Sequence, residues 1–129
     1  LANIDIIERE RLCDNAAAMG ERLYRGLEDA FADHPNVGEI RGGKGLLAAV
    51  EFVDDRASKR NFAPGSKIAA RLKAELLERR VVTRTRPAAG PHPAPGDILF
   101  FAPPLIVSGD ETDQLVRAAR ESAKAVLGV

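Results

Sequence analysis

The chain opens on a long helical pattern of apolar positions. Between about Ile4 and Ala32, apolar side chains recur every three or four residues, which places them on one stripe of a helix. The stripe consists of Leu12, Ala16, Met19, Leu23, Leu27 and Phe31. Pro35 follows, and the residue before a proline is steered away from helical geometry. We therefore predict one long helix that ends near Ala32.

Two short apolar runs follow this helix. The first spans Val37 to Arg41 and the second Leu46 to Val53, with the glycine-rich segment Gly42 to Gly45 between them. This arrangement predicts two strands joined by a tight turn. Glu51 is the only polar residue in the second run, so we expect both faces of that strand to be covered at least in part.

A polar segment from Asp54 to Gly65 is expected to form a surface loop before the next helix. Ser66 stands where its hydroxyl can cap a helix that runs to about Arg80. The core stripe of this helix consists of Ile68, Leu72 and Leu76. The run from Val81 to Arg84 then predicts a return to strand.

The last third of the chain begins with a proline-rich segment. Pro87 to Pro95 contains four prolines, so neither regular structure can form there and we expect an exposed excursion. A strand is predicted from Ile98 to Ala102. Ser108 and Glu111 match a Ser-x-x-Glu capping box, in which two side chains satisfy two free amides at the start of a helix. This final helix is predicted to run to about Leu127.

The order helix, two strands, helix, two strands, helix predicts the α+β class. Strand pairs with short connections favour a small, mostly antiparallel sheet, and the helices would pack on one of its faces. A length of 129 residues suits a single domain.

Composition removes several classes of partner. Nineteen basic and nineteen acidic residues give zero formal charge, so the chain has no overall field to attract nucleic acid or a membrane surface. The one local basic cluster is Arg79, Arg80, Arg84 and Arg86. With five Phe, one Tyr and no Trp in the chain, this cluster lacks the aromatic residues that stack on bases. We expect no nucleic-acid or membrane partner.

Two residues, Cys13 and Leu1, indicate the cellular compartment and whether the chain is part of a longer protein. Cys13 is the only cysteine, which excludes an internal disulfide and favours a reducing, cytoplasmic compartment. The chain begins at Leu1 rather than at methionine, as expected of a fragment of a longer protein.

Catalytic groups are not indicated anywhere in the sequence. His34 and His92 each stand beside a proline, and we interpret both as solvated loop residues without metal-ligand neighbours. The glycines between Arg41 and Gly45 are interpreted as a turn rather than a phosphate cradle, because no helix follows them. We assign no catalytic, metal-binding or cofactor-binding residue to this chain.

Two arginines remain as candidates for binding. Alternation along a strand would put Arg84 and Arg86 on the same face. If that face borders a cleft, either guanidinium could clasp a carboxylate through two parallel hydrogen bonds. The alternative is an arginine that only pairs with a surface carboxylate.

The order of five segments resembles the C-terminal part of the class III aminotransferases. These segments are Ile4 to Glu10, Val37 to Gly42, Gly45 to Glu51, Val81 to Arg84, and Phe101 to Leu105. The resemblance implies a fold-type I enzyme in which a large domain holds pyridoxal 5'-phosphate on a lysine and a small domain closes over the substrate. Residues 1–129 would be the small domain, with the large domain absent and the fragment inactive alone.

The resemblance also implies a substrate-binding residue. In many members an arginine just before the Gly-Asp-x-Ile segment binds the substrate carboxylate, and the matching residue is Arg84. The proline-rich segment is longer than the usual link, which leaves Arg86 as a second candidate. The apolar turn from Pro103 to Leu105 would shape the wall of the site.

The implied reaction transfers an amino group between an amine or amino acid and a 2-oxo acid, in a homodimer. A related isomerase or decarboxylase, and the identity of donor and acceptor, stay open at this point. The other hypothesis is a non-catalytic interaction module with the same fold. A domain cut from a larger enzyme would expose apolar surface, whereas an independent module would be polar there.

Overall fold

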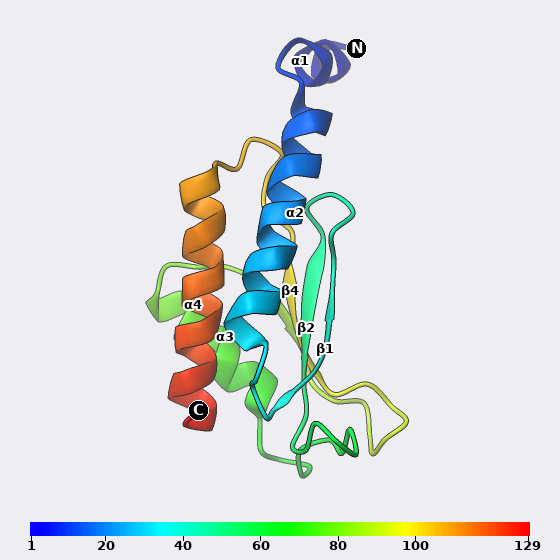
Figure 1. The fold of residues 1–129 in the computed structure, drawn as a ribbon, viewed down its shortest axis with the longest axis vertical. Helices are drawn as coiled ribbons and strands as arrows, with labels where there is room; N and C mark the ends of the chain where they lie inside the picture. Colours follow the sequence, from blue (N-terminus) through cyan, green and yellow to red (C-terminus); the bar gives the residue numbers. More distant parts are fainter.

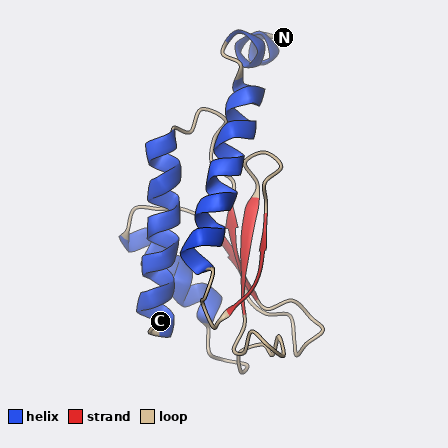
Figure 2. Cartoon of the chain, in the orientation of Figure 1, coloured by secondary structure: helices blue, strands red, loops and turns tan.

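The structure, a computed structural model, describes residues 1–129 and has a helical layer packed on a sheet (Figures 1 and 2). The elements are α1 (Ala2–Arg9), α2 (Leu12–Phe31), β1 (Val37–Arg41), β2 (Ala48–Phe52), α3 (Ile68–Glu78), β3 (Arg84–Arg86), β4 (Asp97–Phe101) and α4 (Gly109–Leu127). The strands lie in the order β1-β2-β4-β3, and all neighbours are antiparallel. Helices α2, α3 and α4 lie on one side of the sheet. The predicted α+β class is confirmed.

The N-terminal segment forms two helices, so the prediction of a single long helix is wrong. The break lies at Glu10 and Arg11, where Arg11 has a φ of 52°. A left-handed residue cannot continue a right-handed helix. Helix α1 contacts only α2, at the far end of the molecule in Figure 1, and buries none of its residues. The apolar side of α1, which includes Ile4, therefore has no partner within this chain.

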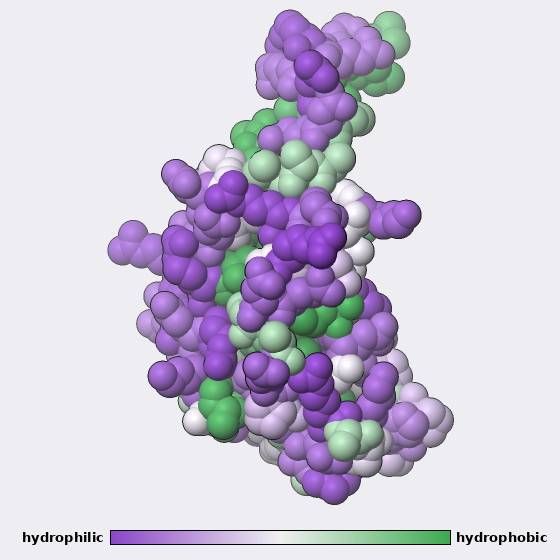
Figure 3. Space-filling view, in the orientation of Figure 1, coloured by the Kyte–Doolittle hydropathy of each residue, from purple (hydrophilic) through white to green (hydrophobic).

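The core lies between the helices and the sheet. The predicted α2 stripe is confirmed at its C-terminal end, where Leu23, Leu27 and Phe31 are buried. Phe31 meets Phe52 of β2 edge to face, with 5.9 Å between ring centroids, a favourable aromatic geometry. Figure 3 shows that the outer surface of α2 and α4 is mostly hydrophilic.

The turn between β1 and β2 depends on glycines within the turn and on a glycine of helix α2. Gly43 and Gly45 have positive φ values of 79° and 73°, which glycine adopts without strain. On the neighbouring helix, a Cβ built at Gly20 would lie 2.0 Å from the carbonyl oxygen of Gly45. The absence of a side chain at position 20 therefore allows α2 to contact this turn directly.

Helix α3 begins without the predicted cap from Ser66. Lys67 holds the N-cap position in a left-handed conformation, and no side chain of the neighbouring sequence caps the helix. The amide of Ala69 donates instead to Asp97 Oδ1 on strand β4, at 3.0 Å. Burial raises the pKa of Asp97. The predicted core stripe is confirmed, because its three residues are all buried.

Strand β3 begins three residues later than predicted. Arg80 has a φ of 60°, and the amide of Val81 donates to the carbonyl oxygen of Leu76 at 2.9 Å. This bond closes the end of α3, in the manner of the left-handed caps that commonly end helices. The segment from Val81 to Thr83 consequently forms no strand, and β3 pairs with β4 through Arg84 to Arg86 alone.

The predicted capping box at the start of α4 is confirmed. Ser108 Oγ accepts from the amide of Glu111 at 3.2 Å, and a Glu111 carboxylate oxygen accepts from the amide of Ser108 at 2.8 Å. The amide and the hydroxyl of Ser108 both donate to the Glu111 carboxylate, and these bonds lower the pKa of Glu111. The helix ends at Leu127, as predicted.

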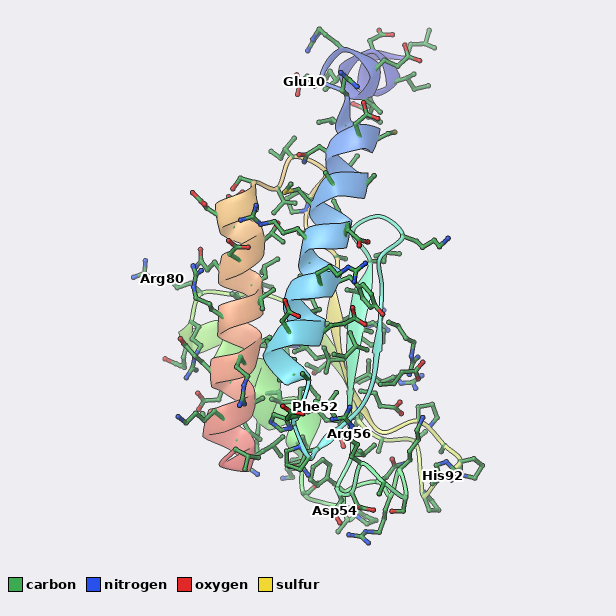
Figure 4. All side chains as sticks on the ribbon, in the orientation of Figure 1. Glu10, Phe52, Asp54, Arg56, Arg80 and His92 are labelled. Atoms are coloured by element: carbon green, nitrogen blue, oxygen red, sulfur yellow. The ribbon has the colours of Figure 1, made fainter.

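The proline-rich segment forms no helix or strand, as predicted. The side-chain amide of Asn61 donates to the carbonyl oxygens of Gly90 and Ala94, at 2.6 and 2.8 Å, and so bridges two points of this segment. His92 lies at its exposed tip (Figure 4). None of the helices in the structure is long and apolar enough to cross a membrane.

Candidate functional site

A large cavity lies where β4 ends and α4 begins. Its volume is about 980 Å³, and it is bordered by the ends of β1, β2 and β4, the segment from Arg80 to Arg84, and the first turns of α4. Much of its surface is apolar, and Leu47, Val82 and Leu115 contribute to it. A mostly apolar cavity with a few polar groups is typical of a small-molecule site.

Arg84 borders this cavity and Arg86 does not. The two residues share one face of β3, as predicted, because Thr85 between them points to the other face. Their partners across the sheet differ, since Arg84 pairs with Phe100 and Arg86 with Ile98. The register therefore places Arg84 nearer the end of β4 that opens into the cavity.

The guanidinium of Arg84 has no carboxylate partner in the chain. The ion pairs of the structure involve other arginines throughout. Arg79, by contrast, pairs with Glu75 at 2.6 Å and also donates to the Glu75 carbonyl oxygen near the end of α3. The alternative in which Arg84 only pairs with a surface carboxylate therefore finds no support within this chain.

Arg41 lies on the same row of the sheet as Arg84 but is already paired. The row runs Arg41, Ala49, Phe100, Arg84 across the four strands. Arg41 lies 3.1 Å from a carboxylate oxygen of Glu39 and 3.2 Å from one of Glu51. Its charge is thus met by two carboxylates, which leaves Arg84 as the cation on this row that is free for a ligand.

Glu51 accounts for the single polar position in strand β2. Its side chain is largely buried, and its second carboxylate oxygen accepts from the amide of Gly96 at 2.7 Å. The pairing of Arg41 with Glu51 was not predicted from the sequence, where the one acidic residue in an apolar strand was the available signal.

Arg80 also borders the cavity, but its side chain projects away from the body of the molecule (Figure 4).

The segment after β4 forms one wall of the cavity. Pro103 and Pro104 line it, as predicted, whereas Leu105 of the same turn does not. The side-chain amide of Asn15 donates to the carbonyl oxygens of Leu105 and Val107, at 2.7 and 3.1 Å. These bonds tie the wall to helix α2, a connection that no local sequence pattern indicates.

The prediction for one histidine is wrong. His34 was expected to be solvated, yet only 3% of it is exposed, and its ring packs edge-on against Phe31 and Phe52. Its Nδ1 accepts from the amide of Asn36 at 3.2 Å. Burial, reinforced by the positive charge of Arg120, lowers the pKa of His34. The ring therefore belongs to the core and lies outside the cavity.

The glycine segment after Arg41 is a turn between two strands, as predicted from the sequence. The lysines of the chain are exposed, and none of them lines the cavity. The cavity thus offers a guanidinium for an anion but no amine that could hold a carbonyl cofactor covalently.

Comparisons with known proteins identify relatives of all or part of the chain. The family model described as aminotransferase class-III matches residues 1–121. Diaminobutyrate–2-oxoglutarate transaminase of Halomonas elongata is 43% identical over 126 residues, which cover 98% of this chain and 25% of that protein. Taurine–pyruvate aminotransferase of Bilophila wadsworthia is 54% identical over 63 residues, or 49% of this chain and 14% of that protein.

Solved structures agree with this result. A transaminase from the marine bacterium Virgibacillus has a TM-score of 0.88 at 32% identity, covering 99% of this chain and 28% of that one. The omega transaminase of Pseudomonas jessenii, in complex with PMP, has a TM-score of 0.83 at 38% identity, covering 98% of this chain and 25% of that one. The chain spans about a quarter of the length of the curated relatives that it matches end to end.

Proposed function

This chain belongs to the class III aminotransferase family, and we propose that residues 1–129 form the C-terminal small domain of a longer pyridoxal-phosphate-dependent aminotransferase. The proposed enzyme transfers an amino group between an amine or amino acid and a 2-oxo acid. The similarity along nearly the whole chain and the share of each relative that it covers support this proposal. Apolar side chains exposed beside the cavity, Leu47 and Val82, also favour a domain over an independent module.

Within that enzyme, the role of this chain is to supply a wall that binds the substrate carboxylate. The supporting observation is that Arg84 borders the cavity with no carboxylate partner of its own. A guanidinium presents two parallel N–H donors that match the two oxygens of a carboxylate. Arg86 lies outside the cavity and is the less suitable of the two candidates.

The apolar part of the cavity would accept the rest of the substrate. Val82, Phe100 and Pro104 line the cavity together with Arg84, and they offer no acid or base. They would exclude water around the bound carboxylate, which strengthens its interaction with the guanidinium. Binding and orientation, rather than proton transfer, are the contributions that these residues can make.

The cofactor would be held by the large domain. Members of this family are generally pyridoxal-phosphate enzymes, and the cofactor supplies the electron sink for the bond-breaking step. The residues of this chain do not fit a covalent site for the cofactor, because no lysine borders the cavity.

We extend the proposal to a cytoplasmic homodimer. The single free cysteine, Cys13, supports a reducing compartment.

The proposal is tested by Arg84→Ala in the full-length enzyme. Hydrogen bonds to charged groups contribute about 1.5–3 kcal/mol, so the KM for a 2-oxo acid should rise roughly 10- to 100-fold. The KM for an amine without a carboxylate should stay within about twofold of wild type, because it loses no contact. Arg86→Ala, on the same strand face, is the matched control and should change neither value. Equal effects of Arg84→Ala on both substrates would contradict the assigned role.

A further inference from the structure

Strand β3 gives Arg84 little support from the backbone. The strand has three residues, lies at the edge of the sheet and pairs with β4 only. Arg84 is its first residue, and the segment before it is not part of the ladder. The ends of short edge strands open easily, because few bonds hold them. Another contact is needed to keep Arg84 directed at the cavity.

Thr83 supplies such a contact. Its hydroxyl donates to the carbonyl oxygen of Phe100, which is the residue paired with Arg84 across the strands. The bond therefore joins the residue just before Arg84 to the residue directly opposite it. Thr83 is partly buried and borders the cavity together with Arg84 and Phe100. Its β-branched side chain has few rotamers, which keeps the hydroxyl on its acceptor at little entropic cost.

We propose that Thr83 is a positioning residue that holds Arg84 in the direction needed to bind the substrate carboxylate. This inference rests on the function proposed for Arg84. A bidentate guanidinium contact requires both distance and angle to be correct, so a small rotation at the start of β3 weakens it. The hydroxyl of Thr83 touches neither substrate nor cofactor in this role and acts only through Arg84.

Thr85 provides a matched control on the same strand. It is the same residue type two positions along the chain, and its side chain points to the helical side of the sheet. It lies outside the cavity, and its hydroxyl takes part in none of the side-chain hydrogen bonds of the structure. Thr85→Val thus makes the same chemical change as Thr83→Val without removing a bond near Arg84.

The experiment compares Thr83→Val, Thr83→Ser and Thr85→Val in the full-length enzyme. Thr83→Val keeps the shape and removes the donor; the KM for a 2-oxo acid should rise roughly three- to tenfold, as expected for one lost hydrogen bond. The KM for an amine without a carboxylate should not change. Thr83→Ser restores the donor and should recover most of the wild-type value, and Thr85→Val should match wild type.

A double variant separates positioning from general damage. In the Arg84→Ala background, Thr83→Val should cause no further rise in the KM for the oxo acid, because the residue through which it acts is gone. Melting temperatures identify any variant that fails to fold, and Thr83→Ala then replaces Thr83→Val as the variant without the donor.

The outcomes distinguish this inference from the function on which it rests. A wild-type KM for the oxo acid in the folded Thr83 variant that lacks the hydroxyl would overturn the positioning role, as would an equal rise of KM for both substrates. In either case a selective effect of Arg84→Ala would leave the proposed function standing. If Arg84→Ala itself is not selective for the oxo acid, both the carboxylate-binding role proposed for Arg84 and the inference about Thr83 are wrong.

Discussion

The close contact between Gly20 and Gly45 makes a specific prediction about stability. Replacing Gly20 by alanine would put a methyl carbon 2.0 Å from the Gly45 carbonyl oxygen and 2.4 Å from its carbonyl carbon. Non-bonded atoms prefer separations of about 3.5 Å, so helix α2 and the turn would have to move apart by more than about 1 Å. The obstacle is backbone and cannot rotate away, as a side chain could.

Two opposing terms set the magnitude. Alanine favours a helix over glycine by about 1 kcal/mol, which stabilises the variant. Overpacking of a close contact costs about 1–3 kcal/mol, and a backbone obstacle places this case at or beyond the upper end. We therefore expect Gly20→Ala to lower the free energy of unfolding by about 2 kcal/mol. With a urea slope of about 2 kcal/mol per M, the unfolding midpoint should fall by about 1 M.

Gly26→Ala, on the same helix, is the control. A Cβ at Gly26 would lie 2.9 Å from a methyl group of Val116, a side chain that can shift. The gain in helix propensity should offset most of the cost, so the midpoint should change by less than about half as much as for Gly20→Ala. Urea unfolding followed by circular dichroism measures both variants. A Gly20→Ala protein as stable as wild type would refute the reasoning.

Two further predictions concern buried titratable groups. Because the pKa of His34 is lowered in the folded protein, the unfolded chain binds the proton more readily, and stability should fall as pH drops below about 6.5. The free energy of unfolding should change by at most about 1.4 kcal/mol per pH unit. Urea midpoints measured between about pH 5 and 7.5 should show this dependence in wild type. If the same dependence persists in His34→Leu, His34 is not its cause. Asp97→Ala removes the acceptor for the Ala69 amide and should cost about 1–2 kcal/mol. Asp97→Asn keeps an oxygen acceptor and should cost less than half as much by the same measurement; equal losses would show that the cap is not the cause.

Local patterns in the sequence were sufficient for most of the secondary structure. The capping box at Ser108 and the glycine turn before β2 are formed by residues within a few positions of one another, so their physics is contained in short segments. The core stripe of α3 was likewise readable, because helical periodicity alone determines which side of a helix is apolar. The resemblance of five segments to one family also came from the sequence, and the family is confirmed.

Contacts between distant segments explain the predictions from sequence that were wrong or undecided. Helix α3 is capped by Asp97, which accepts a hydrogen bond from the Ala69 amide 28 residues away. From the sequence, the nearby Ser66 therefore appeared the better candidate for the cap. His34 stands beside a proline in a turn, yet the packing of α2 against β2 buries it. The break at Arg11 was hidden because α1 continues the apolar pattern without having a surface to bury it against.

The choice between Arg84 and Arg86 shows the same division. Alternation along the chain placed both on one face of a strand, and that part of the prediction is confirmed. Which of the two borders a cavity depends on the register with β4 and on the wall that Asn15 ties in place from helix α2. Sequence periodicity reports the direction of a side chain relative to its own strand, whereas a cavity is formed by segments whose meeting only the tertiary fold determines.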